Sequence, residues 1–369
     1  LVRDEEGQKM SKSKGNVIDP VEVIQEYGAD ALRFTLAVHA AMGRDVKLSK
    51  PRIEGYRHFI NKIWNAARFA LMNLEEPVPE MDLSTTRSFS HRFILQEMER
   101  IKQEVAEALE GYRFNEAAQE LYQFLWHTYC DWYLEMIKPE LYSGDKSRRG
   151  EARACLHKSF TELLVLLHPF VPFVTQELWS HFPGIEEQNL ARVPYPQMRP
   201  ECRNEELPAW MDFLQQVVVS VRNVRSELDL NPGRKLTLLA RMDGQRAAFL
   251  EQNRQVVCDL ARLQGLSIDP ELTSPEAAAS NVVDGCELFV PLEGVVDFRA
   301  EVERLDKQLG KVDKDLNGSE KKLANEDFVN KAPADVVDKE RQRRDELRQK
   351  RDKLSSLRDK LAQYQRDEA

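Results

Sequence analysis

The chain has 369 residues, with 53 Lys and Arg against 62 Asp and Glu and a formal net charge of −9. This length exceeds what one compact core usually holds, so we expect two or three domains. No apolar run approaches the roughly 18 residues of a membrane helix, so we expect no membrane partner. The acidic balance argues against a surface that binds nucleic acid uniformly, because an acidic protein repels a polyanion.

The first residue is Leu1 rather than Met, and no secretory signal follows, so we interpret the chain as a fragment whose N-terminal sequence is missing. The five cysteines are widely spaced and form no Cys-x-x-Cys pair: Cys130, Cys155, Cys202, Cys258 and Cys286. This spacing argues against both structural zinc and a disulfide framework. A reducing, cytoplasmic setting is therefore expected.

Residues 1 to about 18 predict a loop or hairpin, and two helices follow it. Asp19 can act as the N-cap of the first helix, Pro20 suits its first position, and Gly28 suits the residue just past its end. Asp30 can cap the second helix, which includes Phe34.

From about residue 51 to residue 183 the pattern is typical of a helical bundle, because apolar residues recur at steps of three and four. The periodic sets are Ile53, Tyr56, Ile60, Ile63 and Ala67; Ile94, Met98, Ile101, Val105 and Ala108, before a stop at Gly111; and Cys155, Leu156, Phe160, Leu163, Leu164 and Leu167, before Pro169. Further helices are expected from about Asn115 to before Pro139, and around 173–179.

A small α/β unit is expected after a Pro-rich connector at 184–208. Its predicted elements are a helix near 210–228, a strand at 235–241, a helix near 247–263, and strands near 266–268 and 286–296.

The last 70 or so residues change pattern once more. Heptad core positions are Val302, Leu305, Leu309, Val312, Leu316, Ser319 and Leu323, and then Leu347, Leu354, Leu357, Leu361 and Tyr364. The register breaks around 328–333, so two heptad segments predict an antiparallel helical hairpin. This segment carries 19 Lys and Arg against 17 Asp and Glu, so any contact with RNA must use local basic faces. The chain as a whole is expected to be mainly α.

The strongest chemical signal is Lys9-Met10-Ser11-Lys12-Ser13. The stretch from Gln8 to Ile18 contains three lysines and no acid, and Gly7 and Gly15 give the backbone freedom. Ammonium groups on such a loop can neutralise the charge that builds on pyrophosphate when a nucleophile attacks the α-phosphate of ATP. The alternative is a solvated basic turn, which most lysine-rich loops are.

Lys9 to Ser13 resembles the signature loop of the class I aminoacyl-tRNA synthetases, and the stretches 16–20 and 28–33 resemble the segment that follows it. The resemblance implies that Lys9, Met10, Ser11, Lys12 and Ser13 bind the phosphates of ATP. Lys9 and Lys12 would be catalytic, with Lys12 the principal contact and Mg²⁺ accompanying the nucleotide. The helices that follow resemble the fold that contacts the inner corner of tRNA.

Several stretches are similar to the valine-specific members of that family: 43–49, 54–57, 61–69 and 328–337. The resemblance implies a ligase that joins L-valine to tRNA(Val) with ATP, acting as a cytoplasmic monomer. The amino-acid pocket and the His-containing signature would lie outside this chain, so the fragment alone should be inactive. The resemblance divides the chain into the end of the catalytic domain (1–48), a helical anticodon-binding domain (49–200), a small α/β unit (201–297) and a coiled-coil tRNA-binding arm (298–369).

Six aromatic residues crowd one expected helix: Tyr122, Phe124, Trp126, Tyr129, Trp132 and Tyr133. Such rings can stack on unpaired anticodon bases, although any one of them is better explained by core packing. His127 and Cys130 lie one turn apart with no further ligand nearby, so we interpret both as core residues rather than zinc ligands.

Seven basic residues on the second arm helix could meet tRNA phosphates: Lys339, Arg341, Arg343, Arg344, Arg348, Lys350 and Arg351. Two other functions stay open. One is an isoleucyl- or leucyl-tRNA synthetase with an unusual tail, which the missing zinc cysteines and residues 43–49 disfavour. The other is a non-catalytic helical protein ending in a coiled coil, which would give Lys9 and Lys12 no special role.

Overall fold

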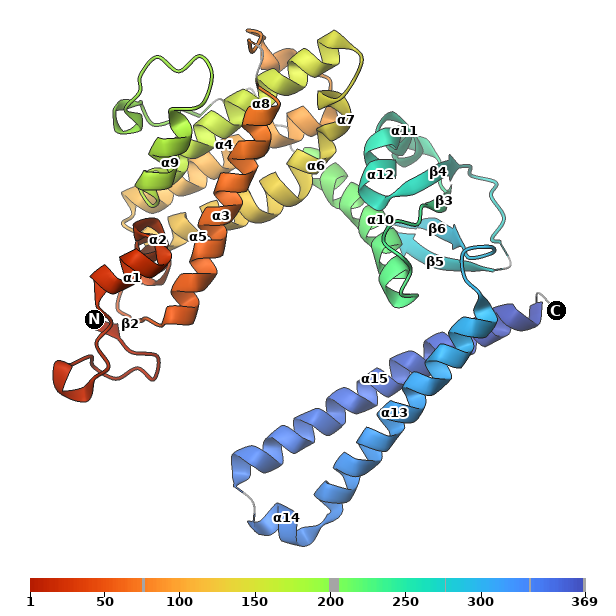
Figure 1. The fold of residues 1–369 in the computed structure, drawn as a ribbon. Coiled ribbons are helices and arrows are strands. Elements are labelled where there is room, and N and C mark those ends of the chain that lie inside the picture. The colour runs from red at the N-terminus through yellow and green to blue at the C-terminus, as the bar shows by residue number, and fades with distance from the viewer. Residues whose placement is uncertain (75–76, 199–205, 276, 332, 368–369) are drawn as a thin grey trace. The chain divides into compact units, whose positions relative to one another are not determined.

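The computed structural model describes residues 1–74, 77–198, 206–275, 277–331 and 333–367. It divides into two compact units, residues 1–215 and residues 216–369. Helices dominate, and strands are few and short (Figure 1). The expected mainly α architecture is confirmed.

The first unit begins with a parallel strand pair that closes a long loop. Strand β1 (Val2–Arg3) pairs with β2 (Val46–Lys47), and a 3-10 turn, η1 (Lys12–Lys14), lies between them in sequence. Helices α1 (Pro20–Tyr27) and α2 (Ala29–His39) occupy the interval before β2. Asp19 caps α1 by accepting the N–H of Val21, as expected.

Asp30 does not cap α2, contrary to expectation. Gly28 is the N-cap residue of α2, and Asp30 lies buried in its first turn. Its carboxylate instead accepts the N–H groups of Phe173 and Val174 at the start of helix α9 (Pro172–Trp179).

Long helices then pack side by side as a bundle (Figure 1). They are α3 (Lys50–Met72), α4 (Phe89–Glu110) and α8 (Lys146–Leu167), with α9 beside them. The expected helix from about 115 is α5 (Phe114–Gln123), which continues as a π-helical segment, η3 (Phe124–Tyr133), and then α6 (Leu134–Met136) and α7 (Lys138–Leu141). Short 3-10 turns η2 (Leu83–Thr85) and η4 (Leu190–Arg192) lie in the connections.

One apolar core joins these helices, and the periodic residues predicted for α3, α4 and α8 contribute most of their side chains to it. Ile63, Met98 and Phe160 are fully buried. The 3.6-residue period therefore identified the core faces correctly, since each helix turns its apolar stripe inward.

The second unit contains the end of α10 (Leu207–Glu227) and a four-stranded sheet in the order β4-β3-β6-β5. The strands are β3 (Leu236–Arg241), β4 (Leu263–Ile268), β5 (Ala278–Val283) and β6 (Cys286–Pro291). Strands β3 and β4 are parallel, and β6 is antiparallel to both β3 and β5. Strand β5 was not expected, and the helix expected at 247–263 is broken at Asn253 into α11 (Gly244–Gln252) and α12 (Arg254–Ala261).

The second unit also contains the hairpin arm. Helix α13 (Phe298–Ala324) runs antiparallel to α15 (Ala334–Asp367), and the short α14 (Glu326–Lys331) lies at the turn (Figure 1). Leu305, Val312 and Leu316 are buried in the apolar seam, which is the contact between α13 and α15, as their heptad positions predicted. The side chains of Leu357 and Tyr364 lie outside the described part, as do Cys202 and residue 332.

Candidate functional site

The lysine-rich loop is anchored at its base by the N-terminal strand pair. The N–H of Leu48 donates to the carbonyl of Arg3, and Arg3 forms an antiparallel bridge with Lys9. Gly7 adopts a φ of 82°, and a Cβ there would lie 3.1 Å from the Cε of Lys47. A glycine is therefore required where the loop leaves the strand pair.

Asn16 connects the two ends of the loop. Its Oδ1 accepts the N–H of Ser11 at 2.9 Å, and its Nδ2 donates to the carboxylate of Asp4 at 2.7 Å. The same Nδ2 lies 3.4 Å from the carbonyl oxygen of Lys9. One side chain thus contacts the backbone of two predicted phosphate-binding residues, Lys9 and Ser11, and joins them to Asp4.

Asp4 is the buried carboxylate beneath the loop. The hydrogen bond from Asn16 is the main influence that lowers its pKa, and the Gln8 N–H and the charge of Lys14 act in the same direction against partial burial. The group is therefore ionised at neutral pH. Its negative charge interacts with the positive charge of Lys14.

The three loop lysines differ in their surroundings. Lys14 donates to the side-chain oxygen of Gln8 at 3.2 Å. Lys9 and Lys12 are exposed, and within the described residues neither amino group has a hydrogen-bonding or ion-pair partner. The same stretch of chain carries two hydroxyl groups, Ser11 Oγ and Ser13 Oγ, which lie 3.2 Å apart. The two lysines predicted to be catalytic are therefore available to a ligand, and their catalytic role stays a prediction.

Met10 lies differently from its four neighbours in the predicted nucleotide-binding set. Its half-buried side chain packs against a small apolar cluster that includes Val23, Leu32 and Ile53. This contact anchors the loop on α1, α2 and α3. Any contact of Met10 with nucleotide stays a prediction.

The aromatic residues around η3 divide between core and surface. Phe124, Tyr129 and Tyr133 are buried, as core packing requires. Tyr122 and Trp126 are half-buried and stacked, with ring centroids 5.6 Å apart. The amino group of Lys62 lies 5.0 Å from the Trp126 centroid, a cation–π distance.

A cavity of about 410 Å³ adjoins the stacked rings, and its lining combines aromatic with hydrogen-bonding side chains. The lining residues are Val38, His39, Arg52, Gly55, Tyr56, Gln119, Tyr122 and Gln123. Aromatic walls with amide and cationic groups are suited to an unpaired nucleotide.

His127 is not a core residue, contrary to expectation. Its side chain is 57% exposed and pairs with Asp131 at 3.4 Å, one turn further along the helix. Cys130 is buried, as expected. Both residues lie in the π-helical segment η3, which has more residues per turn than an α-helix, so three positions no longer bring two side chains to the same face.

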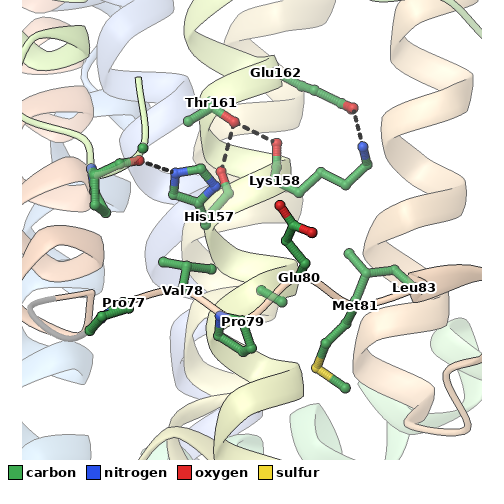
Figure 2. Close-up of a pocket in the computed structure, with 13 residues that line it drawn as sticks. Pro77, Val78, Pro79, Glu80, Met81, Leu83, His157, Lys158, Thr161 and Glu162 are labelled. Atoms are coloured by element: carbon green, nitrogen blue, oxygen red, sulfur yellow. Dashed lines mark hydrogen bonds and ion pairs between the residues drawn. The ribbon is translucent and has the colours of Figure 1, made fainter. Parts of the chain in front are cut away.

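A larger cavity, of about 600 Å³, lies between the segment 77–83 and helix α8 (Figure 2). Its polar groups are largely satisfied within the protein. His157 Nε2 lies 2.8 Å from the carbonyl oxygen of Pro183, Thr161 Oγ1 donates to the α8 backbone, and Lys158 pairs with Glu162 at 3.4 Å. Nothing in this arrangement selects a particular ligand.

Within the described residues, no group of three or more His, Cys, Asp or Glu side chains is placed to hold a metal ion. Among the same residues, no helix is both long and apolar enough to cross a membrane.

Three family models match separate parts of the chain. A model described as tRNA synthetases class I (I, L, M and V) matches residues 1–49, and the anticodon-binding domain of tRNA ligase matches residues 91–240. The valyl tRNA synthetase tRNA binding arm matches residues 297–362.

Curated relatives with the name valine–tRNA ligase match nearly the whole chain. The one from Nitratidesulfovibrio vulgaris is 52% identical over 94% of this chain, and the one from Geobacter sulfurreducens is 47% identical over 94%. The chain spans 39% and 40% of the lengths of these two relatives.

Two solved structures are similar to part of this chain at low TM-scores. They are a LeuRS–tRNA complex from Agrobacterium radiobacter (TM-score 0.44, 22% identity, 64% of this chain and 30% of that one) and the methionyl-tRNA synthetase of Mycobacterium tuberculosis (TM-score 0.41, 20% identity, 48% and 36%). The sequence matches, rather than these structures, decide the family. The chain belongs to the class I aminoacyl-tRNA synthetases, in the valyl-tRNA synthetase family.

Proposed function

We propose that this chain is part of a valine–tRNA ligase, which uses ATP to join L-valine to tRNA(Val) and releases AMP and pyrophosphate. One observation carries this proposal. The amino groups of Lys9 and Lys12 have no partner within the described residues, and hydrogen bonds of Asn16 to Ser11 and Asp4 fix the loop that carries them. The names of the relatives support valine rather than isoleucine or leucine as the amino acid. The three family matches also speak against a non-catalytic coiled-coil protein.

In the activation step the carboxylate of valine attacks the α-phosphate of ATP, and the bond to the pyrophosphate leaving group breaks. Negative charge then accumulates on the β- and γ-phosphates. Lys9 and Lys12 would bind these oxygens, with Lys12 as the principal contact and Ser11 and Ser13 as hydroxyl donors. Mg²⁺ would accompany the nucleotide, and no residue of this chain is assigned to it.

The remaining segments would bind tRNA. We propose that residues 1–48 complete the catalytic domain, 49–200 form the anticodon-binding domain, 201–297 form a linking unit, and 298–369 form the arm. The tRNA-binding arm model, at residues 297–362, supports the last boundary, and the anticodon-binding model, at residues 91–240, supports tRNA binding by the bundle and extends into the third segment. The same family membership leads us to expect a cytoplasmic monomer.

Pyrophosphate exchange in a longer protein that contains this chain and the rest of the nucleotide fold tests the catalytic proposal. Lys12→Ala should slow ATP–pyrophosphate exchange by at least a hundredfold, because removing one charge contact in such a transition state costs roughly 3 kcal/mol. Lys14→Ala is the matched control, since Lys14 already bonds to Gln8, and it should slow exchange less than tenfold. Equal rates for Lys12→Ala and the unaltered protein would refute the role of this loop.

Binding by the 369-residue chain itself tests the RNA proposal. It should bind tRNA(Val) more tightly than tRNA(Ile), and the measurement needs a stated salt concentration because phosphate contacts weaken steeply with salt. Equal affinity for the two tRNAs would remove the support for valine specificity in this part of the protein.

A further inference from the structure

The outer face of arm helix α13 carries a row of lysines. The seam residues Leu305, Val312, Leu316 and Ser319 are buried and fix the helix's orientation. On the opposite face the heptad places seven exposed residues between positions 307 and 321: Lys307, Gly310, Lys311, Lys314, Asn317, Gly318 and Lys321. None of the seven is acidic.

These four lysines have no ion-pair partner within the described residues. The neighbouring acidic residues either form ion pairs with α15 or lie at the edges of the row. Asp306 holds Arg358 at 3.0 Å and Glu320 holds Arg348 at 2.7 Å, both across the seam. Asp313 and Asp315 occupy the two flanks next to the seam, one on each side. The middle of the outer face therefore carries four lysines and no acidic residue.

Helix α15 differs from α13 because acidic residues lie on its outer side. Its outer side carries four exposed aspartates at seven-residue steps: Asp338, Asp345, Asp352 and Asp359. They hold its arginines in ion pairs, for example Arg341 with Asp338, Arg344 with Asp345, and Arg351 with Asp352. Seven basic residues on this helix were predicted from the sequence to contact tRNA phosphates. Four of them are thus already in ion pairs: Arg341, Arg344, Arg348 and Arg351.

Two glycines interrupt the lysine row, and helix formation does not explain them. Gly310 and Gly318 lie inside a long exposed helix, where glycine is the least favourable residue after proline. A Cβ at either position would meet open space, so neither glycine is required by packing within the chain. Their effect is to leave the backbone accessible between the lysines, which allows a ligand to approach closely.

We propose that the outer face of α13, with Lys307, Lys311, Lys314 and Lys321, is the surface on which the arm binds the phosphate backbone of tRNA. This inference rests on the proposed function, and it assigns the contact to α13 rather than to the arginines of α15. The row extends about 21 Å at 1.5 Å per residue. That length allows the four ammonium groups to meet several successive phosphates, and such contacts fix position without reading sequence.

The test measures binding of tRNA(Val) to the full 369-residue chain over a range of salt concentrations. The triple variant Lys307→Gln, Lys314→Gln, Lys321→Gln should weaken binding at least tenfold at about 0.1 M salt. It should also reduce the slope of log affinity against log salt by about 2 to 3, close to one unit for each lost phosphate contact. Affinity for tRNA(Ile) should fall by a similar factor, because backbone contacts carry no sequence preference.

The matched control removes three lysines from α15 instead: Lys339→Gln, Lys350→Gln, Lys353→Gln. These lysines are also exposed and unpaired within the described residues, so the change in net charge is the same. Binding should change less than threefold. Equal losses in the two triple variants would overturn the assignment to α13, as would no loss in the α13 variant. If the unaltered chain binds no tRNA at all, the proposed function itself fails and this inference with it.

The glycines provide a second, independent readout. Gly310→Gln with Gly318→Gln should raise the melting temperature of the arm, because glutamine favours helix more than glycine does. The same variant should weaken tRNA binding severalfold, because its side chains cover the backbone between the lysines. A variant that melts higher and binds tRNA as tightly as the unaltered chain would contradict close approach at this face.

Discussion

The carboxylate of Asp30 accepts the N–H of Val174 at 2.7 Å, and these two residues lie 144 positions apart. The residue at the N-cap of α9 is Val171, which has no side-chain oxygen with which to cap the helix. Asp30, which lies in the first turn of α2, caps α9 instead. It also accepts the N–H of Phe173 at 3.2 Å. A capping bond thus joins α2, which follows the lysine loop in sequence, to α9, which packs beside it.

Replacing Asp30 tests how much this bond stabilises the first unit. Asp30→Ala should lower the free energy of unfolding by about 1–2 kcal/mol, because the first N–H groups of α9 lose their acceptor. Asp30→Asn should cost less, because the amide oxygen can still accept a hydrogen bond. Urea unfolding followed by circular dichroism measures both, and equal losses for the two variants would contradict capping as the role.

The pH dependence of the same site has a definite sign. Burial raises the pKa of Asp30 above its ordinary value of 3.8, although the N–H groups of Val174 and Phe173 oppose this shift. The folded state therefore holds the proton more tightly than the unfolded chain. Raising the pH from below 3.8 through the higher folded pKa should reduce this residue's contribution to stability, and Asp30→Asn should remove that dependence.

A buried ion pair fixes the start of α4 to α7. His91 Nε2 lies 2.8 Å from Glu140 Oε2, and the His91 side chain is fully buried. Burial alone would lower the pKa of His91, but Cys155 and the Glu140 carboxylate outweigh it and raise the pKa to about 10. The stabilisation is complete below the unfolded value near 6.5 and is lost as pH rises towards 10. Unfolding measured between pH 6 and pH 10 should show this decline.

Single and double variants separate the pair from its surroundings. His91→Ala should cost about 3–5 kcal/mol, because Glu140 is left buried without its partner. His91→Ala combined with Glu140→Ala should cost less than the sum of the two single changes. Additive losses would show that the two side chains act independently, and a stability that does not change between pH 6 and pH 10 would contradict a charged His91.

Apolar packing between α13 and α15, rather than the ion pairs between them, should stabilise the arm. Arg348 and Glu320 are 51% and 39% exposed, so Arg348→Ala should cost less than about 1 kcal/mol. Leu316 is buried in the seam, and Leu316→Ala should cost about 2–4 kcal/mol. Thermal melting of the chain at low and high salt measures both. A larger loss for Arg348→Ala would mean that the ion pairs dominate.

The elements that the sequence predicted correctly are those with local causes. Helix α1 has its cap and its proline within four residues, α4 ends at Gly111, and α13 repeats its apolar residues every heptad. Each of these signals acts between neighbours in the chain. The lysine loop is also a contiguous motif with flanking glycines, and its role in binding nucleotide stays a prediction.

The features that escaped prediction have distant causes. The pairing of Val2 with Val46 joins two-residue strands that carry no periodic signal of their own. Strand β5 includes Ser280 and Asn281, and it is stabilised by its pairing with β6 rather than by its own apolar residues. The role of Asp30 depends on α9, a helix that is distant in sequence. Tertiary contacts overrode local propensity in each case.

Asn16 offers the sharpest test of how the loop is held for catalysis. Asn16→Ala removes the acceptor of the Ser11 N–H and the donor to Asp4, so Lys9 and Lys12 keep their charges but lose their fixed backbone. In the longer protein, pyrophosphate exchange should slow at least tenfold and the KM for ATP should rise, whereas Lys12→Ala should mainly lower kcat. Val17→Ala is the control, because Val17 is exposed beside Asn16 and should leave both constants unchanged. The melting temperature should change by no more than about 2 °C, because the loop contributes little to the core. A slow enzyme with an unchanged KM would mean that Asn16 acts on chemistry alone, and an unchanged enzyme would mean that the loop needs no fixed backbone to bring its lysines to the phosphates.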